Sequence, residues 1–153
     1  MRLISRRGAL LALGTATLAA CAREETPEDG KTMDLSGIND AVEASSPRVV
    51  SVTKSERVVD GLGHGVSMEL RVDGADAMSS EDLDAIVKAI WLSAPWEPNG
   101  ISLMAFADDA EEEPVDLRAA AKELTPTFSD SYGEGGISMI AMQKRYGEWK
   151  KPA

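Results

Sequence analysis

Four sets of residues in this chain could take part in chemistry: the single cysteine Cys21, the single histidine His64, a run of carboxylates between 108 and 116, and seven methionines. A thiolate is a nucleophile and metal ligand, imidazole is a general base, carboxylates bind Ca²⁺ and thioethers bind Cu(I). A single cysteine excludes an internal disulfide, and one cysteine with one histidine excludes a Cys/His zinc site. Whether any of these four sets takes part in catalysis or binding must be judged from the residues around it.

Cys21 follows a segment that is typical of a secretory signal peptide. Residues 1–7 contain three arginines and no acidic residue, and residues 8–20 read GALLALGTATLAA. This apolar run is shorter than the roughly 20 residues that span a bilayer. A basic start, a short apolar core and small residues before a cleavage site define a signal peptide. We therefore expect residues 1–20 to be removed.

The residues around the expected cleavage site carry a more specific pattern. Leu18-Ala19-Ala20-Cys21 resembles the lipobox of bacterial prolipoproteins. The resemblance implies cleavage before Cys21 by signal peptidase II, a diacylglyceryl thioether on Cys21 and usually an acylated amine. Two or three acyl chains anchor a protein stably, whereas one does not. Cys21 is thus the predicted lipidation site, and the membrane is a predicted partner. Ala22 resembles the pattern for outer-membrane sorting in a cell with two membranes.

A second export pattern overlaps the first. Residues 5–10, SRRGAL, resemble the twin-arginine signal, although Ala9 replaces the usual Phe and Leu11 stands where Lys is common. Arg6 and Arg7 are the predicted signal-recognition residues. Two arginines also suit the basic start of an ordinary Sec signal, which stays open as an alternative. Unchanged export after replacement of both arginines by lysine would exclude the twin-arginine route.

The mature chain is expected to be a short tether and one domain. The signal peptide holds 3 of the 16 basic residues and none of the 26 acidic ones, so the mature chain is more acidic than the formal −10 of the whole. This charge argues against a nucleic-acid surface, which needs a basic footprint. Residues 21–32 are polar, include Pro27 and Gly30, and are predicted to form a flexible tether. Residues 33–153 are predicted to form a single domain.

Hydrophobic periodicity predicts seven elements in this domain. They are a short helix near 35–42, strands at 49–59 and 66–72, a helix from Ser79 or Ser80 to 94, a strand at 101–106, a helix from Pro114 to Leu124 and a strand at 137–141. The first two strands, separated by the glycine-rich turn 61–65, are expected to form an antiparallel hairpin, and the helical crossovers imply parallel neighbours. The tail is expected to hold one helical turn.

This element order predicts an α+β fold, a two-layer sandwich with a four-stranded mixed sheet and helices on one face. It is loosely similar to ferredoxin-like and BON-like small domains, a likeness of element order that carries no function. The other face of the sheet is expected to be polar. Its predicted residues are Thr53, Ser67, Glu69, Arg71, Ser102 and Ser138.

The carboxylates and His64 lack supporting motifs. His64 lies in GLGHG between two strands, and no G-x-S-x-G elbow is present, so it is interpreted as a turn residue. Phosphate-binding loops precede a helix N-terminus rather than join two strands. The carboxylates of 108–116 lack the EF-hand spacing and are interpreted as a solvated loop that stabilises the next helix start.

The methionines and tryptophans are interpreted mainly as packing residues. Met68, Met104 and Met139 fall in predicted strands, where Met commonly fills gaps in a core. Trp91 is predicted to be buried, and Trp96 and Trp149 to cover the edge of the core, with an exposed interface as the alternative.

The last segment is locally basic. From Gln143 onward, four basic residues oppose only Glu148, and they are expected to fold back on the acidic domain, with lipid headgroups as the alternative target. The four are Lys144, Arg145, Lys150 and Lys151.

The sequence therefore predicts no catalytic, cofactor-binding or metal-binding residue. The predicted function is that of a membrane-anchored extracytoplasmic lipoprotein, a non-catalytic binding or scaffolding module with a protein partner in the cell envelope. Two alternatives stay open: a small extracytoplasmic hydrolase that uses carboxylates and His64, and a metal-handling accessory protein that uses the acidic loop.

Overall fold

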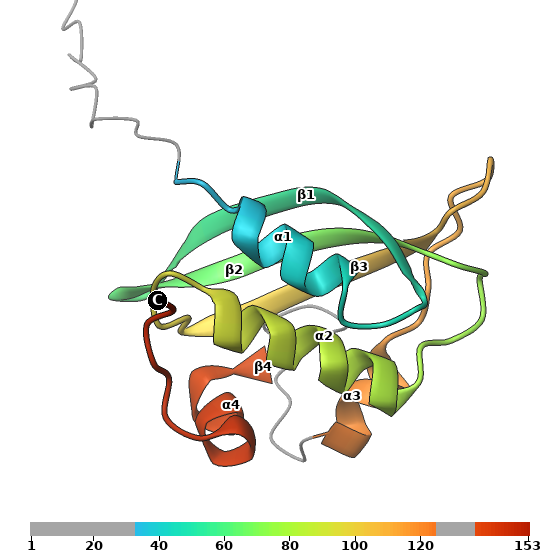
Figure 1. Ribbon diagram of the computed structural model, residues 1–153. Helices are drawn as coiled ribbons and strands as arrows, with labels where there is room; N and C mark the ends of the chain where they lie inside the picture. The colour runs from blue at the N-terminus through green and yellow to red at the C-terminus, as the bar shows by residue number, and fades with distance from the viewer. Residues whose placement is uncertain (1–32, 125–136) are drawn as a thin grey trace, which may run out of the picture. The chain divides into compact units, whose positions relative to one another are not determined.

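The computed structural model describes residues 33–124 and 137–153, which belong to the unit from Thr32 to Ala153. The predicted signal peptide and tether, with Arg6, Arg7 and Cys21, lie outside the described residues. None of the helices in the described part is both long and apolar enough to cross a membrane. The elements are α1 (Ser36–Glu43), β1 (Val49–Asp60), β2 (Gly63–Val72), α2 (Ser80–Ser93), β3 (Gly100–Ala107), α3 (Arg118–Leu124), β4 (Ile137–Ser138) and α4 (Met139–Tyr146) (Figure 1).

The described strands form one mixed sheet in the order β1-β2-β3-β4. β1 and β2 are antiparallel, as the hairpin prediction requires, and β2 and β3 are parallel, with α2 as the crossover between them. Helices α1 and α2 lie over the same face of this sheet (Figure 1). The predicted α+β class and the predicted four-stranded mixed sheet are therefore confirmed.

The core lies between that face and the helices. Along β2, the side chains at Val66, Met68, Leu70 and Val72 are buried and alternate with partly exposed ones, because successive strand residues point to opposite faces. The apolar stripe along one face of α2 packs on these β2 side chains. Each buried aliphatic side chain contributes about 2 kcal/mol of transfer free energy. The buried residues of this stripe are Leu83, Ile86, Val87, Ile90 and Trp91.

Serine hydroxyls fix the start of α2. Ser79 is its N-cap, and its hydroxyl accepts a hydrogen bond from the main-chain N–H of Asp82 at 3.1 Å. The hydroxyls of Ser79 and Ser46 donate to the two carboxylate oxygens of Asp82 at 2.6 and 2.7 Å. These hydrogen bonds, that of Ser79 first, hold the pKa of Asp82 below its ordinary value. The same contacts tie the segment before β1 to α2.

The predicted last strand is mostly wrong. Only Ile137 and Ser138 form a strand, and α4 begins at Met139 because the Ser138 hydroxyl caps it through the N–H of Ala141 at 3.4 Å. This short strand runs antiparallel to β3, so the parallel pairing expected for the second helical crossover is also wrong. The single helical turn predicted in the tail is present as residues 143–146, which form the last turn of the eight-residue helix α4.

The predicted start of the helix that follows β3 is wrong as well. Pro114 forms an isolated antiparallel bridge with Phe106, and α3 begins four residues later, at Arg118. The main-chain N–H of Ala107 donates to the carbonyl of Glu113, and that of Val115 donates to the carbonyl of Ala105, both at 2.9 Å. Residues 113–115 are therefore bound along the end of β3 rather than wound into a helix.

The turn between β1 and β2 is shorter than the predicted turn at 61–65. Only Gly61 and Leu62 lie between the strands, and Gly63 and Gly65 belong to β2. A Cβ atom at Gly65 would lie 2.8 Å from the carbonyl oxygen of Gly100, the first residue of β3. Gly65 is thus required by a close approach of two main chains.

Candidate functional site

The face of the sheet opposite α1 and α2 carries most of the predicted polar residues. Ser67, Glu69 and Arg71 alternate with the buried residues of β2, and they pair in register with Ser102, Met104 and Phe106 of β3. Thr53 lies at an irregularity of β1, where its hydroxyl donates to the carbonyl of Glu69 at 3.3 Å. Ser138 is the N-cap of α4.

Sequence reasoning missed the apolar part of this face. Met104 was expected to pack in the core as Met68 does, but its side chain is 49% exposed whereas that of Met68 is buried. The signal was available in the sequence, because Met104 and Phe106 follow the polar Ser102 at intervals of two residues and therefore share its face, opposite the buried Leu103 and Ala105. Apart from Ser102, the run 101–106 is apolar on both faces, and this hides the alternation. The face is therefore polar along β2 and apolar at Met104 and Phe106 of β3.

Arg71 joins the two parts of this face. Its guanidinium lies 5.5 Å from the centre of the Phe106 ring, and its Nη2 lies 2.8 Å from the carboxylate of Glu112. The Arg71 side chain is only 17% exposed, and its Nη1 is buried without a hydrogen-bond partner among the described residues. Arg71 thereby fixes the loop that follows β3 against the sheet.

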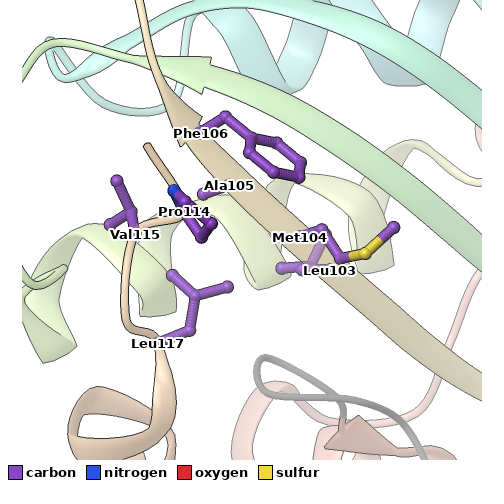
Figure 2. Close-up of a pocket in the computed structure, with 7 residues that line it drawn as sticks. All are labelled: Leu103, Met104, Ala105, Phe106, Pro114, Val115 and Leu117. Atoms are coloured by element: carbon purple, nitrogen blue, oxygen red, sulfur yellow. The ribbon is translucent and has the colours of Figure 1, made fainter. Parts of the chain in front are cut away.

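An apolar pocket lies at the end of β3. Its volume is about 310 Å³, at the lower end of the range for small-molecule sites. Figure 2 shows β3 side chains on one side of it and the segment from Pro114 to Leu117 on the other. The antiparallel bridge between Phe106 and Pro114 holds these two walls together. The lining residues are Leu103, Met104, Ala105, Phe106, Pro114, Val115 and Leu117.

The lining determines what this pocket can bind. No described side chain in it carries a nitrogen or oxygen atom, so it offers no side-chain hydrogen bond and no acid or base. Burial of apolar surface is the only large favourable contribution that such walls supply. The pocket can therefore hold an apolar side chain or a hydrocarbon group, but its described side chains supply no group for catalysis.

His64 has a structural role through its main chain. It lies within β2, opposite Val59, rather than in the turn that was predicted. Its carbonyl accepts hydrogen bonds from the indole Nε1 of Trp96 at 3.2 Å and from the N–H of Asn99 at 2.9 Å. Trp96 packs on the core, and the centre of its ring lies 5.2 Å from Cζ of Arg57. These contacts fix the segment between α2 and β3 to the hairpin.

The acidic loop is stabilised by hydrogen bonds between its own carboxylates and nearby main-chain N–H groups. Oδ1 of Asp109 accepts hydrogen bonds from the N–H groups of Glu111 and Glu112, and Glu112 has a positive φ of 52°. Asp116 accepts a hydrogen bond at 2.8 Å from the N–H of Arg118, where α3 begins, as predicted for this run. Among the described residues, no group of three or more His, Cys, Asp or Glu side chains is placed to hold a metal ion.

Part of the basic tail folds back on the domain. Arg145 binds the carboxylate of Asp84 on α2, and its Nη1 lies 3.5 Å from the carbonyl oxygen of Leu124 at the end of α3. Trp149 packs against the core, and Trp91 is fully buried, as predicted. Lys144 and Lys150 are exposed. The fold-back prediction is thus confirmed for Arg145.

Comparison of the chain with protein-family models, with curated proteins and with solved structures finds no match.

Proposed function

We propose that this chain is a lipid-anchored module of the bacterial cell envelope that binds an apolar segment of a partner protein in the pocket beside β3. The observation that carries the binding part is the pocket itself, whose described lining is entirely apolar and includes the half-exposed Met104. The anchor rests on the lipobox-like residues 18–21 and their position after a signal-like segment. The two parts are tested separately.

The anchor is tested by metabolic labelling with a clickable fatty acid. Cys21→Ser removes the thiol that would carry the lipid, so the variant is expected to lose the label and to accumulate as an uncut precursor. Thr17→Ser, a mild change in the same segment, is the matched control and keeps the label. Label that persists on Cys21→Ser contradicts the anchor and leaves the pocket proposal intact.

The pocket is tested by a pair of charge insertions. Met104 and Val50 are similarly exposed, at 49% and 47%, but only Met104 lines the pocket. After cross-linking in intact membranes, Met104→Asp is expected to lose a specific co-isolated protein that wild type and Val50→Asp retain, because a carboxylate in an apolar wall disfavours apolar contact. Equal recovery with both variants, or no specific protein with wild type, contradicts the proposal.

A further inference from the structure

Carboxylates border the apolar pocket beside β3. From Met104 to Arg118 the chain contains six acidic residues and one basic residue, and all six acidic side chains are exposed. They lie in the loop after β3 and in the segment that forms the second wall of the pocket, where Glu113 and Asp116 adjoin lining residues. The six are Asp108, Asp109, Glu111, Glu112, Glu113 and Asp116.

Glu69 adds a carboxylate on the side of β2. It is in register with Met104 in the parallel pair of β2 and β3, and it alternates with the buried residues of β2, so it lies on the face of the sheet opposite α1 and α2 (Figure 1). Lys54 lies opposite Glu69 in the hairpin, but its Nζ is bound to Glu56 at 3.2 Å. Carboxylates therefore approach the pocket from both β2 and the loop after β3.

Two arginines near the pocket are already paired with part of this charge. Arg71 binds Glu112 at 2.8 Å, and Arg118 binds Asp116 at 3.1 Å. Each guanidinium group thus offsets one carboxylate. The border carboxylates that form no ion pair within residues 33–124 and 137–153 are Glu69, Asp108, Asp109, Glu111 and Glu113.

We propose that the partner segment bound in this pocket is cationic, with an apolar side chain in the pocket and lysine or arginine residues beside it that pair with the border carboxylates. The proposal rests on the proposed function, because it names the chemistry of the same partner. A cationic segment supplies the counter-charge that these carboxylates lack, whereas an acidic segment is repelled by them. Apolar burial then supplies affinity and the border supplies selectivity.

Two labelled peptides test the sign of the charge. Both have the same leucine-valine-leucine centre, which is flanked by lysines in one and by glutamates in the other. Both are titrated against the full chain in phosphatidylcholine nanodiscs, whose lipids carry no net charge. At low salt the lysine peptide is expected to bind about tenfold more tightly or better, and added salt is expected to shrink this preference, because mobile ions screen exposed charges.

The failure of this proposal is distinguishable from that of the proposed function. Met104→Ser removes part of the apolar wall without adding charge. Equal affinities of the two peptides, both weakened by Met104→Ser, overturn the cationic preference and leave the proposed function standing. Binding of dodecanoate with neither peptide bound identifies a hydrocarbon ligand instead, and overturns this proposal together with the protein-partner part of the proposed function.

Neutralisation of the border tests where the preference arises. Glu69→Gln combined with Glu113→Gln removes two border carboxylates and is expected to weaken binding of the lysine peptide about fivefold or more. Asp40→Asn combined with Glu81→Gln is the control, since it removes two exposed carboxylates on α1 and α2, over the other face of the sheet (Figure 1). The control is expected to change the affinity less than about twofold. Equal effects of the two double variants assign the preference to the overall acidity of the chain and overturn the proposal.

Discussion

Nε of Arg145 on α4 lies 2.6 Å from Oδ1 of Asp84 on α2, although the two residues are 61 positions apart in the chain. The Tyr146 hydroxyl donates to the same carboxylate oxygen at 2.5 Å. Arg145, together with Tyr146, holds the pKa of Asp84 below its ordinary value. Burial first, and then the hydrogen bond to Asp84, raises the pKa of Tyr146 well above its usual range. One carboxylate therefore docks α4 onto α2.

Asp84→Asn is predicted to destabilise the fold by about 1 to 2 kcal/mol. The amide removes the charge that two donors share, and hydrogen bonds to charged groups are stronger than neutral ones. The loss is limited because the ion pair is partly exposed. Urea unfolding measures the change, with Glu81→Gln, an exposed carboxylate on the same helix, as the control. Equal stability of the two variants would show that this contact does not hold α4.

Acid pH is predicted to weaken the fold through Asp84 and Asp82. Both carboxyls have a lowered pKa in the folded chain, whereas the unfolded chain takes up these protons near 3.8. Below about pH 5 the unfolded state therefore binds more protons, and stability falls until the pH reaches the lowered values. The same variant, Asp84→Asn, is expected to flatten this slope without abolishing it, because Asp82 still titrates. Denaturant unfolding at a series of pH values measures it.

Alkaline pH is predicted to weaken the fold through Tyr146. Its pKa is raised in the folded chain above the ordinary value of 10.0, so its contribution is complete below that value and is lost as the pH rises further. Tyr146→Phe is expected to remove the alkaline slope, and Tyr132→Phe is the comparison. An unchanged slope in Tyr146→Phe would assign the loss to other groups.

The sequence was sufficient to predict elements whose hydrophobic pattern repeats several times. The stripe of α2 from Leu83 to Trp91 and the alternation along β2 each repeat over several residues, so their type and buried face were predicted correctly. Residues 137–141 were too short for a period to show, and the capping hydroxyl of Ser138 was the only local indication of a helix. The contact between Asp84 and Arg145 depends on the tertiary fold, which no spacing in the sequence encodes.

The pocket beside β3 shows the same limit. It exists because Pro114 bridges to Phe106, and this pairing competes with a helix that Pro114 would otherwise be suited to start. Both outcomes agree with the local sequence, and packing against the end of β3 decides between them. The main-chain hydrogen bonds between residues 113–115 and the end of β3 explain why α3 starts at Arg118 instead.

Arg48→Lys is predicted to loosen the loop between β2 and α2. The guanidinium of Arg48 donates to main-chain carbonyls of residues 73–77, with Nε 3.1 Å from the oxygen of Asp73 and Nη1 2.9 Å from that of Ala77. Its Nη2 donates to the carbonyl of Asp76. An ammonium group has no planar fork to reach all of these acceptors. We expect faster amide exchange in residues 73–77 and a loss of about 1 kcal/mol.

The control for this prediction is Arg118→Lys. Arg118 pairs with Asp116 on an exposed surface, where exchange of one cation for another is expected to cost less than about 0.5 kcal/mol. If both variants leave amide exchange in residues 73–77 unchanged, the carbonyl contacts of Arg48 do not hold the loop.

Two glycine-to-alanine changes are predicted to have opposite signs. In Gly65→Ala the added methyl group meets the main-chain carbonyl of Gly100 at 2.8 Å, and two paired strands must separate to admit it, so a loss of about 1 to 3 kcal/mol is expected. Gly37 lies in the first turn of α1 with no atom within 4 Å of an added Cβ, so Gly37→Ala is expected to stabilise the fold by about 0.5 kcal/mol through lower entropy of the unfolded chain. Urea midpoints of the two variants measure both changes. Stabilisation by Gly65→Ala would mean that β2 and β3 are further apart at this point than the structure places them, because only the distance between the two main chains sets the sign.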